Sequence, residues 1–170
     1  MLQQSLNGIL DKSVKVRDIE IVDSSFHSRH SPHSKVYSYR MSMTDYPRAF
    51  EPELSYPIGK GVNLGRMIDA AREFTGTHNF ESFRASDCCA NTAERTINCS
   101  ELITSGDLLV YRVQGTGFLK QMVRIMVGTL VEVGKGKIES VPEVLQAKDR
   151  TQAGQTAPPG PLCLERVDYL

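Results

Sequence analysis

The stretch Gly117–Gly128, GFLKQMVRIMVG, decides the fold of this chain. Its apolar residues recur at helical spacing and continue to Val131, which predicts an amphipathic helix with one face in a core. Gly115 and Gly117 precede it and allow a sharp turn out of the preceding strand. The apolar stripe consists of Leu119, Met122, Val123, Met126, Val127, Leu130 and Val131.

Four further segments have the alternation or the β-branched content of strands. Arg95–Ile103 and Leu108–Gln114 flank Ser105-Gly106-Asp107, which predicts a hairpin. Lys35–Met43 alternates, and Val14–Val22 is rich in β-branched residues, so each is expected to form a strand. The chain returns as a last strand at Leu162–Tyr169, after a proline-rich link.

Two other helices are expected from capping signals. Asn63 is suited to cap a helix that ends before Gly76. Ser140 with Glu143 three residues later forms a capping-box pattern. The predicted order is strand, strand, helix, hairpin, two helices, strand. This order predicts an α+β fold with a mainly antiparallel sheet and helices packed on one face.

Composition limits the classes of protein that this chain can represent. It has 170 residues, 40% of them hydrophobic, which suits one domain with a sizeable core. No apolar run is long enough to cross a bilayer, so no membrane association is expected. The formal net charge is zero, which disfavours nucleic-acid binding through bulk positive charge but leaves room for a local basic cleft. The spacing of the four cysteines matches neither a disulfide framework nor a zinc pair, which favours a reduced, intracellular setting.

Two basic patterns have a functional and a structural interpretation. Lys120, Arg124 and Gly128 are four residues apart, so on a helix they share a face that suits an anionic partner. On spacing alone, an ordinary solvated face is the favoured alternative. Arg84 follows Phe80 and Phe83; this arrangement suits a loop that directs a guanidinium at RNA, or two core rings beside a local salt bridge.

Histidines and tyrosines supply two more candidates. His27, His30 and His33 have a spacing that suggests a metal site, but Pro32 makes a helix there unfavourable and no cysteine lies close by, so no metal is expected. Tyr37 and Tyr39 lie on one side of a predicted strand. They suit either stacking on a base or ordinary sheet packing.

Five blocks, taken together, resemble the TruA-type tRNA pseudouridine synthase family, and the resemblance covers almost the whole chain. The helix block and the proline-rich block are its most specific parts. In order, the blocks are Phe26–Arg29, Lys35–Tyr39, Asn79–Ala85, Gly117–Gly128 and Thr156–Leu162.

The resemblance implies an isomerase that converts uridine to pseudouridine in the tRNA anticodon arm without a cofactor. An aspartate attacks the nucleotide, and the base detaches, turns and rejoins through carbon. By motif, Tyr37 would stack on the uracil, Arg124 would pair with the aspartate, and Leu162 would pack against the base. Arg29, Arg84 and Lys120 would contact tRNA. The family further implies a homodimer, in the cytoplasm or in an organelle.

The chain departs from the family at the nucleophile. Leu6-Asn7 also fits a Leu-Asn pair of the family. The family's aspartate lies in an R-T-D segment upstream of that pair, and no such segment occurs here. Asp149-Arg150-Thr151 has the reverse order, and Asp87 lies in a different motif. We therefore expect residues 1–170 to be the C-terminal domain of such an enzyme, without the N-terminal lobe that carries the aspartate, and inactive alone. The alternative is a non-catalytic tRNA-binding module that retains the substrate cleft.

Overall fold

A computed structural model describes residues 2–28, 30–46, 49 and 52–169. The chain divides into two compact units, Met1–Ser31 and Pro32–Leu170. Each unit is described separately below. Within the described residues, no helix is long and apolar enough to cross a membrane.

Among the described residues of the first unit, Leu2–Ile9 form the helix α1. The Asn7 carboxamide binds the main chain of Val16 in both directions, because its Nδ2 donates to the Val16 carbonyl and its Oδ1 accepts from the Val16 N–H, each at 2.8 Å. The expected strand at Val14–Val22 is wrong, since these residues have neither helix nor strand and Ile21 is fully exposed. A strand needs a neighbouring backbone to pair with, and here the side chains of Asn7 and Gln3 bind the Val16 main chain.

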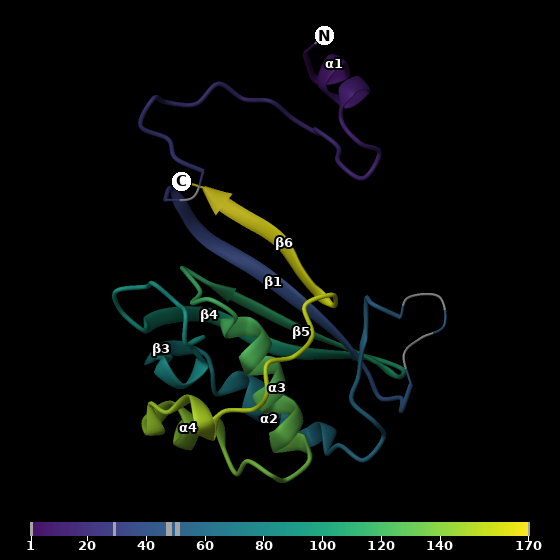
Figure 1. Ribbon diagram of the computed structural model, residues 1–170, viewed down its shortest axis with the longest axis vertical. Helices are drawn as coiled ribbons and strands as arrows, with labels where there is room; N and C mark the ends of the chain where they lie inside the picture. The colour runs from purple at the N-terminus through teal and green to yellow at the C-terminus, as the bar shows by residue number, and fades with distance from the viewer. Residues whose placement is uncertain (1, 29, 47–48, 50–51, 170) are drawn as a thin grey trace. The chain divides into compact units, whose positions relative to one another are not determined.

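The second unit is built on a six-stranded, mainly antiparallel sheet, which confirms the predicted α+β class (Figure 1). The central strand β1 (Pro32–Ser42) pairs antiparallel with β5 on one edge. On its other edge it pairs with β6 along most of its length and, at its end, parallel with the two-residue β2. The other strands are β2 (Tyr56–Pro57), β3 (Gly76–Asn79), β4 (Glu94–Ser105), β5 (Leu108–Gly115) and β6 (Leu162–Tyr169).

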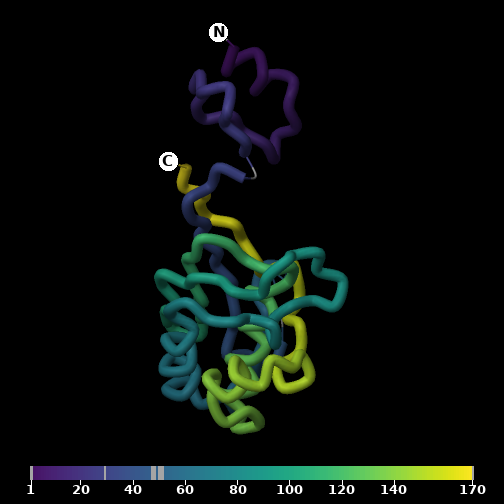
Figure 2. The backbone as a smooth tube through the Cα atoms, turned by 90° about the vertical axis from the view of Figure 1, so that its left-hand side faces the viewer, coloured from purple at the N-terminus to yellow at the C-terminus, as the bar shows by residue number. Residues whose placement is uncertain are grey.

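Three helices pack with this sheet. They are α2 (Leu64–Arg72), α3 (Met122–Gly134) and α4 (Val141–Ala147). The cap expected at Asn63 is confirmed, because its side chain accepts from the Arg66 N–H at 3.0 Å. Figure 2 shows the coils of α2 and α4 at the same end of the second unit. Two single 3-10 turns, Glu81–Phe83 and Arg150–Gln152, complete the set.

The two faces of the sheet differ in chemistry. The face towards the helices carries Tyr39, Met41, Leu109 and Tyr111, whose side chains have no exposed surface. The other face is mixed and carries charged groups: Arg112 on β5 forms ion pairs with Glu101 on β4 and Glu165 on β6. This division confirms that the helices cover one face of the sheet, and it fixes which side of β1 belongs to the core.

Two details of the predicted helices are wrong. Helix α3 begins at Met122, after Gln121 in the left-handed region at φ 61°, so Lys120 precedes the helix and does not share a helical face with Arg124. At α4, the Ser140 side chain makes no capping bond. The Val141 N–H donates to the Glu73 carboxylate at 3.1 Å instead, because tertiary packing brings a stronger acceptor to the start of the helix.

The backbone between α4 and β6 crosses α3 at two glycines. A Cβ on Gly128 would lie 1.7 Å from the Gln155 carbonyl oxygen, and one on Gly154 would lie 2.4 Å from the Gly128 carbonyl carbon. The Gly154 N–H donates to Thr129 Oγ1 at 2.9 Å at this crossing. The close approach that Gly128 was expected to permit is therefore made by the chain's own backbone.

Replacing Gly128 by alanine should destabilise the protein by about 3 kcal/mol, because an added methyl group meets main chain that has no room to move. Urea denaturation measures the loss. Gly61→Ala is the matched control, since nothing lies within 4 Å of its added Cβ, and it should be neutral or slightly stabilising. Equal midpoints for the two variants would contradict the tight crossing.

Candidate functional site

Arg124 projects from the first turn of α3 and is held by the segment that crosses the helix. Its Nε–H donates to the Ala157 carbonyl at 2.6 Å, while the Ala157 N–H donates to the Arg124 carbonyl at 3.2 Å. The side chain is partly buried. Within the described part of the chain, no hydrogen bond or ion pair engages its two terminal nitrogens. The guanidinium is thus fixed at one nitrogen, and its two terminal NH₂ groups are left to donate to a ligand.

Tyr39 lies beside this arginine on the core face of β1. Its hydroxyl donates to the Pro158 carbonyl at 2.8 Å, one residue beyond the carbonyl that holds Arg124. Burial raises the pKa of the Tyr39 hydroxyl, and the charge of Arg124 opposes part of that rise. Tyr39 and Arg124 therefore fix two successive carbonyl groups of the proline-rich segment.

Tyr37 is two residues away on the same face of β1 and is less buried than Tyr39. Its ring meets that of Phe118 edge to face, with the centroids 5.1 Å apart. Gly115 makes room for this contact, because a Cβ there would lie 3.2 Å from the Phe118 ring and 2.8 Å from the Thr96 carbonyl oxygen. Burial raises the pKa of the Tyr37 hydroxyl, so that hydroxyl remains protonated at neutral pH.

Leu162 begins β6 and pairs with Tyr39 across the two strands. Paired residues on neighbouring strands point to the same face, so Leu162 faces the same side as Tyr37 and Tyr39. It is partly exposed and packs against the edge of the core. The structure therefore places Tyr37, Leu162 and Arg124, all predicted from motifs, along one side of the β1–β6 ribbon.

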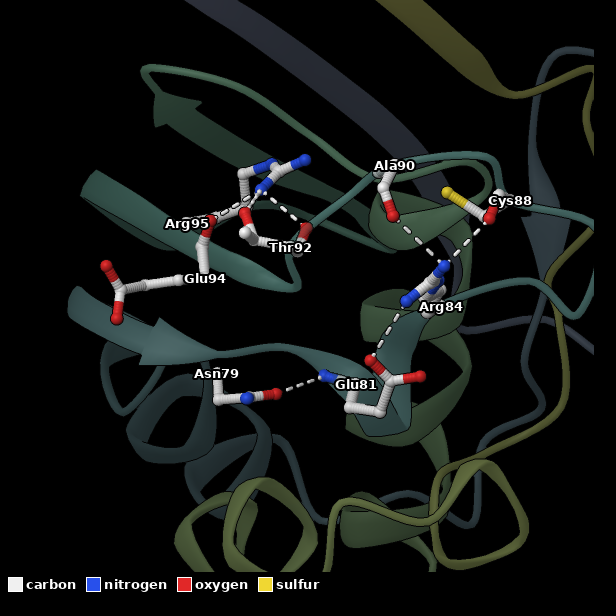
Figure 3. A network of polar contacts seen from close by, with 8 residues as sticks. All are labelled: Asn79, Glu81, Arg84, Cys88, Ala90, Thr92, Glu94 and Arg95. Atoms are coloured by element: carbon white, nitrogen blue, oxygen red, sulfur yellow. Dashed lines mark hydrogen bonds and ion pairs between the residues drawn. The ribbon is translucent and has the colours of Figure 1, made fainter.

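Arg84 holds a loop. Its Nη1 contacts the Glu81 carboxylate at 3.2 Å, and its Nη2 donates to the carbonyls of Cys88 and Ala90 at 2.9 and 3.1 Å (Figure 3). The side chain is 26% exposed. Phe80 and Phe83 are buried core rings. This is the local salt bridge weighed above as the structural interpretation; a contact of Arg84 with tRNA stays a prediction.

Lys120 forms an ion pair with Asp87 on that same loop, and its carbonyl accepts from the Ala85 N–H at 3.3 Å. The hydrogen bond to Lys120 lowers the pKa of Asp87. Backbone N–H groups of Lys120 and Ala90 lower the pKa of the Cys88 thiol. Both partners of the ion pair are largely exposed, so a polyanion is able to compete with Asp87 for the lysine. Its role in binding tRNA stays a prediction.

The remaining predicted positions give less information. Arg29, proposed as a tRNA contact, lies outside the described residues. The His27 and His30 rings lie 4.4 Å apart and tilted by 49°. Over residues 2–28, 30–46, 49 and 52–169, no group of three His, Cys, Asp or Glu side chains is arranged to hold a metal ion.

Sequence reasoning missed the groups that position Arg124. The partners are main-chain carbonyls at Ala157 and Pro158, and a carbonyl has no residue-type signal. Arg150 was considered only as part of a reversed motif, yet its Nη2 donates to Thr156 Oγ1 at 3.1 Å. The signal that was available is the pair Gly128 and Gly154, which marks a close approach of two backbones.

Arg84→Gln should release the 85–91 loop, because a neutral amide lacks the fork that bridges one carboxylate and two carbonyls. Hydrogen–deuterium exchange of amides in this loop should accelerate, and the free energy of unfolding should fall by about 1–2 kcal/mol. Arg72→Gln is the control, since that arginine makes an exposed pair with Asp69. Unchanged exchange in Arg84→Gln would show that the clamp is not needed to order the loop.

Comparison with known proteins fits this arrangement. A family model described as tRNA pseudouridine synthase matches residues 70–170. A protein of Citrifermentans bemidjiense named tRNA pseudouridine synthase A is 39% identical over 98% of this chain and 68% of its own length. Proteins of the same name from Clostridium kluyveri and Neorickettsia sennetsu are 36% and 38% identical; the matches cover 99% and 94% of this chain and 70% and 65% of the relatives.

The chain thus spans about two thirds of the length of these relatives. The region matched by the family model includes α3 with Arg124, the proline-rich segment with Ala157, and β6 with Leu162. From this family model and these relatives it follows that the chain belongs to the tRNA pseudouridine synthase family.

Proposed function

We propose that these residues form the uridine-binding face of a tRNA pseudouridine synthase, and that an aspartate outside the 170 residues supplies the nucleophile. The observation that carries the proposal is the state of Arg124: it is fixed at Nε, and within the described residues no other group occupies its two terminal nitrogens. Two parallel N–H groups of a guanidinium match the two oxygens of a carboxylate. Arg124 is therefore prepared to receive an aspartate.

The chemistry requires such a partner. A carboxylate enclosed by protein tends to take up a proton, since burial disfavours the charged form. A nearby guanidinium keeps the carboxylate ionised, and only the ionised form is a nucleophile. Arg124 would act on the aspartate, while the aspartate forms the bond to the nucleotide. No metal or redox group is required for an isomerisation of this kind.

The neighbouring residues suit the base. An enzyme that acts on a nucleobase must take it out of the stack and hold it between flat or apolar groups. Tyr37 offers a ring that Phe118 fixes from the edge, and Leu162 offers an apolar side chain at the start of β6. We assign Tyr37 to stacking on the uracil and Leu162 to its far side. Lys120, Arg84 and Arg29 are assigned to the tRNA backbone.

The proposed substrate also bears on the oligomeric state and the compartment of the protein. We propose that the protein acts on tRNA as a homodimer, in the cytoplasm or inside an organelle, without a cofactor. All four cysteines are free thiols, which is compatible with a reducing compartment. A second candidate function, a tRNA-binding module without catalysis, is favoured by one observation: in the described ranges no aspartate or glutamate pairs with Arg124.

Incubated alone with unmodified tRNA, the chain should make no pseudouridine, because positioning and electrostatics without the covalent nucleophile recover only part of the rate. Mass spectrometry after chemical labelling of pseudouridine measures the product. Joining the chain to an aspartate-bearing N-terminal part of a relative should restore turnover. Turnover by the chain alone would point first to Asp87, and loss of that turnover in Asp87→Asn would settle the replacement nucleophile. Failure of the joined protein would favour the binding module.

In the joined protein, Arg124→Lys should retain the fold but lose about a hundredfold in kcat, because lysine keeps the charge and loses the paired donors. Circular dichroism checks folding. Release of tritium from tRNA whose uridines carry tritium at carbon 5 measures turnover. Arg112→Lys, on the face of the sheet away from the helices, is the matched control and should stay near the parent rate. Near-parental turnover by Arg124→Lys would remove Arg124 from the mechanism.

A further inference from the structure

Residues 153–158 have no helix or strand, yet Gly154 and Ala157 are buried. Backbone without secondary structure needs other partners for its polar groups. Along this segment the partners come from three directions: Thr129 on α3 accepts from the Gly154 N–H, Arg124 binds Ala157 in both directions, and Tyr39 donates to the Pro158 carbonyl. The segment is therefore part of the frame that positions Arg124.

Arg150 is the fourth partner of this segment. Its Nη1 donates to the Ala153 carbonyl at 3.4 Å and its Nη2 to the Thr156 hydroxyl at 3.1 Å. It therefore spans the same short segment from the side of the 3-10 turn. Thr156 is the residue directly before Ala157, so any movement of Thr156 displaces the carbonyl that holds Arg124.

The turn that carries Arg150 is fixed independently. Asp149 accepts from the Thr151 N–H and hydroxyl at 2.9 and 2.7 Å, and its own N–H donates to the buried Ser82 hydroxyl at 2.9 Å. The Asp149 carboxylate is thus occupied by Thr151. In the described residues Arg150 has a hydroxyl and a carbonyl as acceptors and no carboxylate.

The neutral partners of Arg150 stabilise its partly buried charge only weakly. Desolvation of the partly buried guanidinium lowers the pKa of Arg150, and neutral acceptors offset such a penalty less than a carboxylate does. A smaller polar side chain would bind one acceptor at lower cost. A rigid fork, however, fixes two acceptors at a set separation, and this suits the positioning of a backbone segment.

We propose that Arg150 is a positioning residue that acts through Thr156 and Ala157 on Arg124. By holding Thr156, it sets the place of the Ala157 carbonyl and hence the direction of the Arg124 guanidinium. This inference rests on the proposed role of Arg124 in catalysis. A misplacement of about 1 Å at a reacting group has large effects on rate, so a residue that contacts neither substrate nor nucleophile is able to control turnover.

The first arm of the test uses the chain itself and needs no activity. Side-chain NMR of arginine Nε–H groups reports the bond from Arg124 to Ala157 directly. Thr156→Val removes the acceptor for Arg150 and keeps the shape, whereas Thr156→Ser retains the hydroxyl. We expect the Arg124 signal to move towards that of free arginine and to exchange faster in Thr156→Val and in Arg150→Gln, and to stay in place in Thr156→Ser.

Thr77→Val is the matched control, because it removes an exposed, hydrogen-bonded hydroxyl on β3 without touching the Arg150 turn or residues 153–158. Its Arg124 signal should stay at the parent position. An unchanged signal in both Thr156→Val and Arg150→Gln would overturn the proposal. The two variants act on opposite partners of one hydrogen bond, so the test does not depend on either one alone being well folded.

The second arm uses the protein joined to an aspartate-bearing part. Thr156→Val should lower kcat roughly tenfold with little change in KM for tRNA, and Thr156→Ser should rescue it. An equal loss in Thr77→Val would overturn the proposal by showing a general structural effect. A displaced Arg124 signal with parental kcat would instead support the coupling and refute the catalytic role of Arg124, so the two failures are distinguishable.

Discussion

The crossing of two backbones at Gly128 and Gly154 is the constraint on which the site depends. Because neither residue has a side chain, the segment after the 3-10 turn lies directly on α3. That contact brings Ala157 beside Arg124, and the next residues lead to Tyr39 and into β6. With any larger residue at the crossing, helix and segment would separate, and the carbonyl that fixes the arginine would move away with the segment.

Elements whose signal is local were predictable from the sequence. The alternation of Lys35–Met43, the hairpin around Gly106 and the apolar stripe of α3 each specify their own structure over adjacent residues, and all three are present. The final strand at Leu162–Tyr169 is also confirmed. The strand expected at Val14–Val22 failed because a β-branched composition is compatible with a strand but does not provide a partner.

Other details depend on contacts between distant residues. The four-residue strand β3 is too short to show an alternation, and it forms because β4 pairs with it. The Ser140 hydroxyl does not cap α4 because Glu73, the residue directly after α2, accepts from the first N–H. Motifs led to the assignments proposed for Arg124, Tyr37 and Leu162, but the group that binds the Arg124 guanidinium is the Ala157 carbonyl. Sequence patterns report residue types, whereas orientation here comes from the main chain.

Three arginines differ in the groups that bind their guanidinium. Arg112 lies between Glu101 and Glu165, so its charge is balanced and it serves the sheet. The charge of Arg84 is balanced by Glu81, and its Nη2 donates to two carbonyl groups of the loop. Arg124 is held by a carbonyl, which orients the group but leaves its positive charge uncompensated within the described residues. A neutral anchor suits the catalytic role that we propose for Arg124, because a resident carboxylate would compete with an incoming one. Although the net charge of the chain is zero, the Arg124 guanidinium thus has no carboxylate partner in the described residues, at the position where we propose that the aspartate binds.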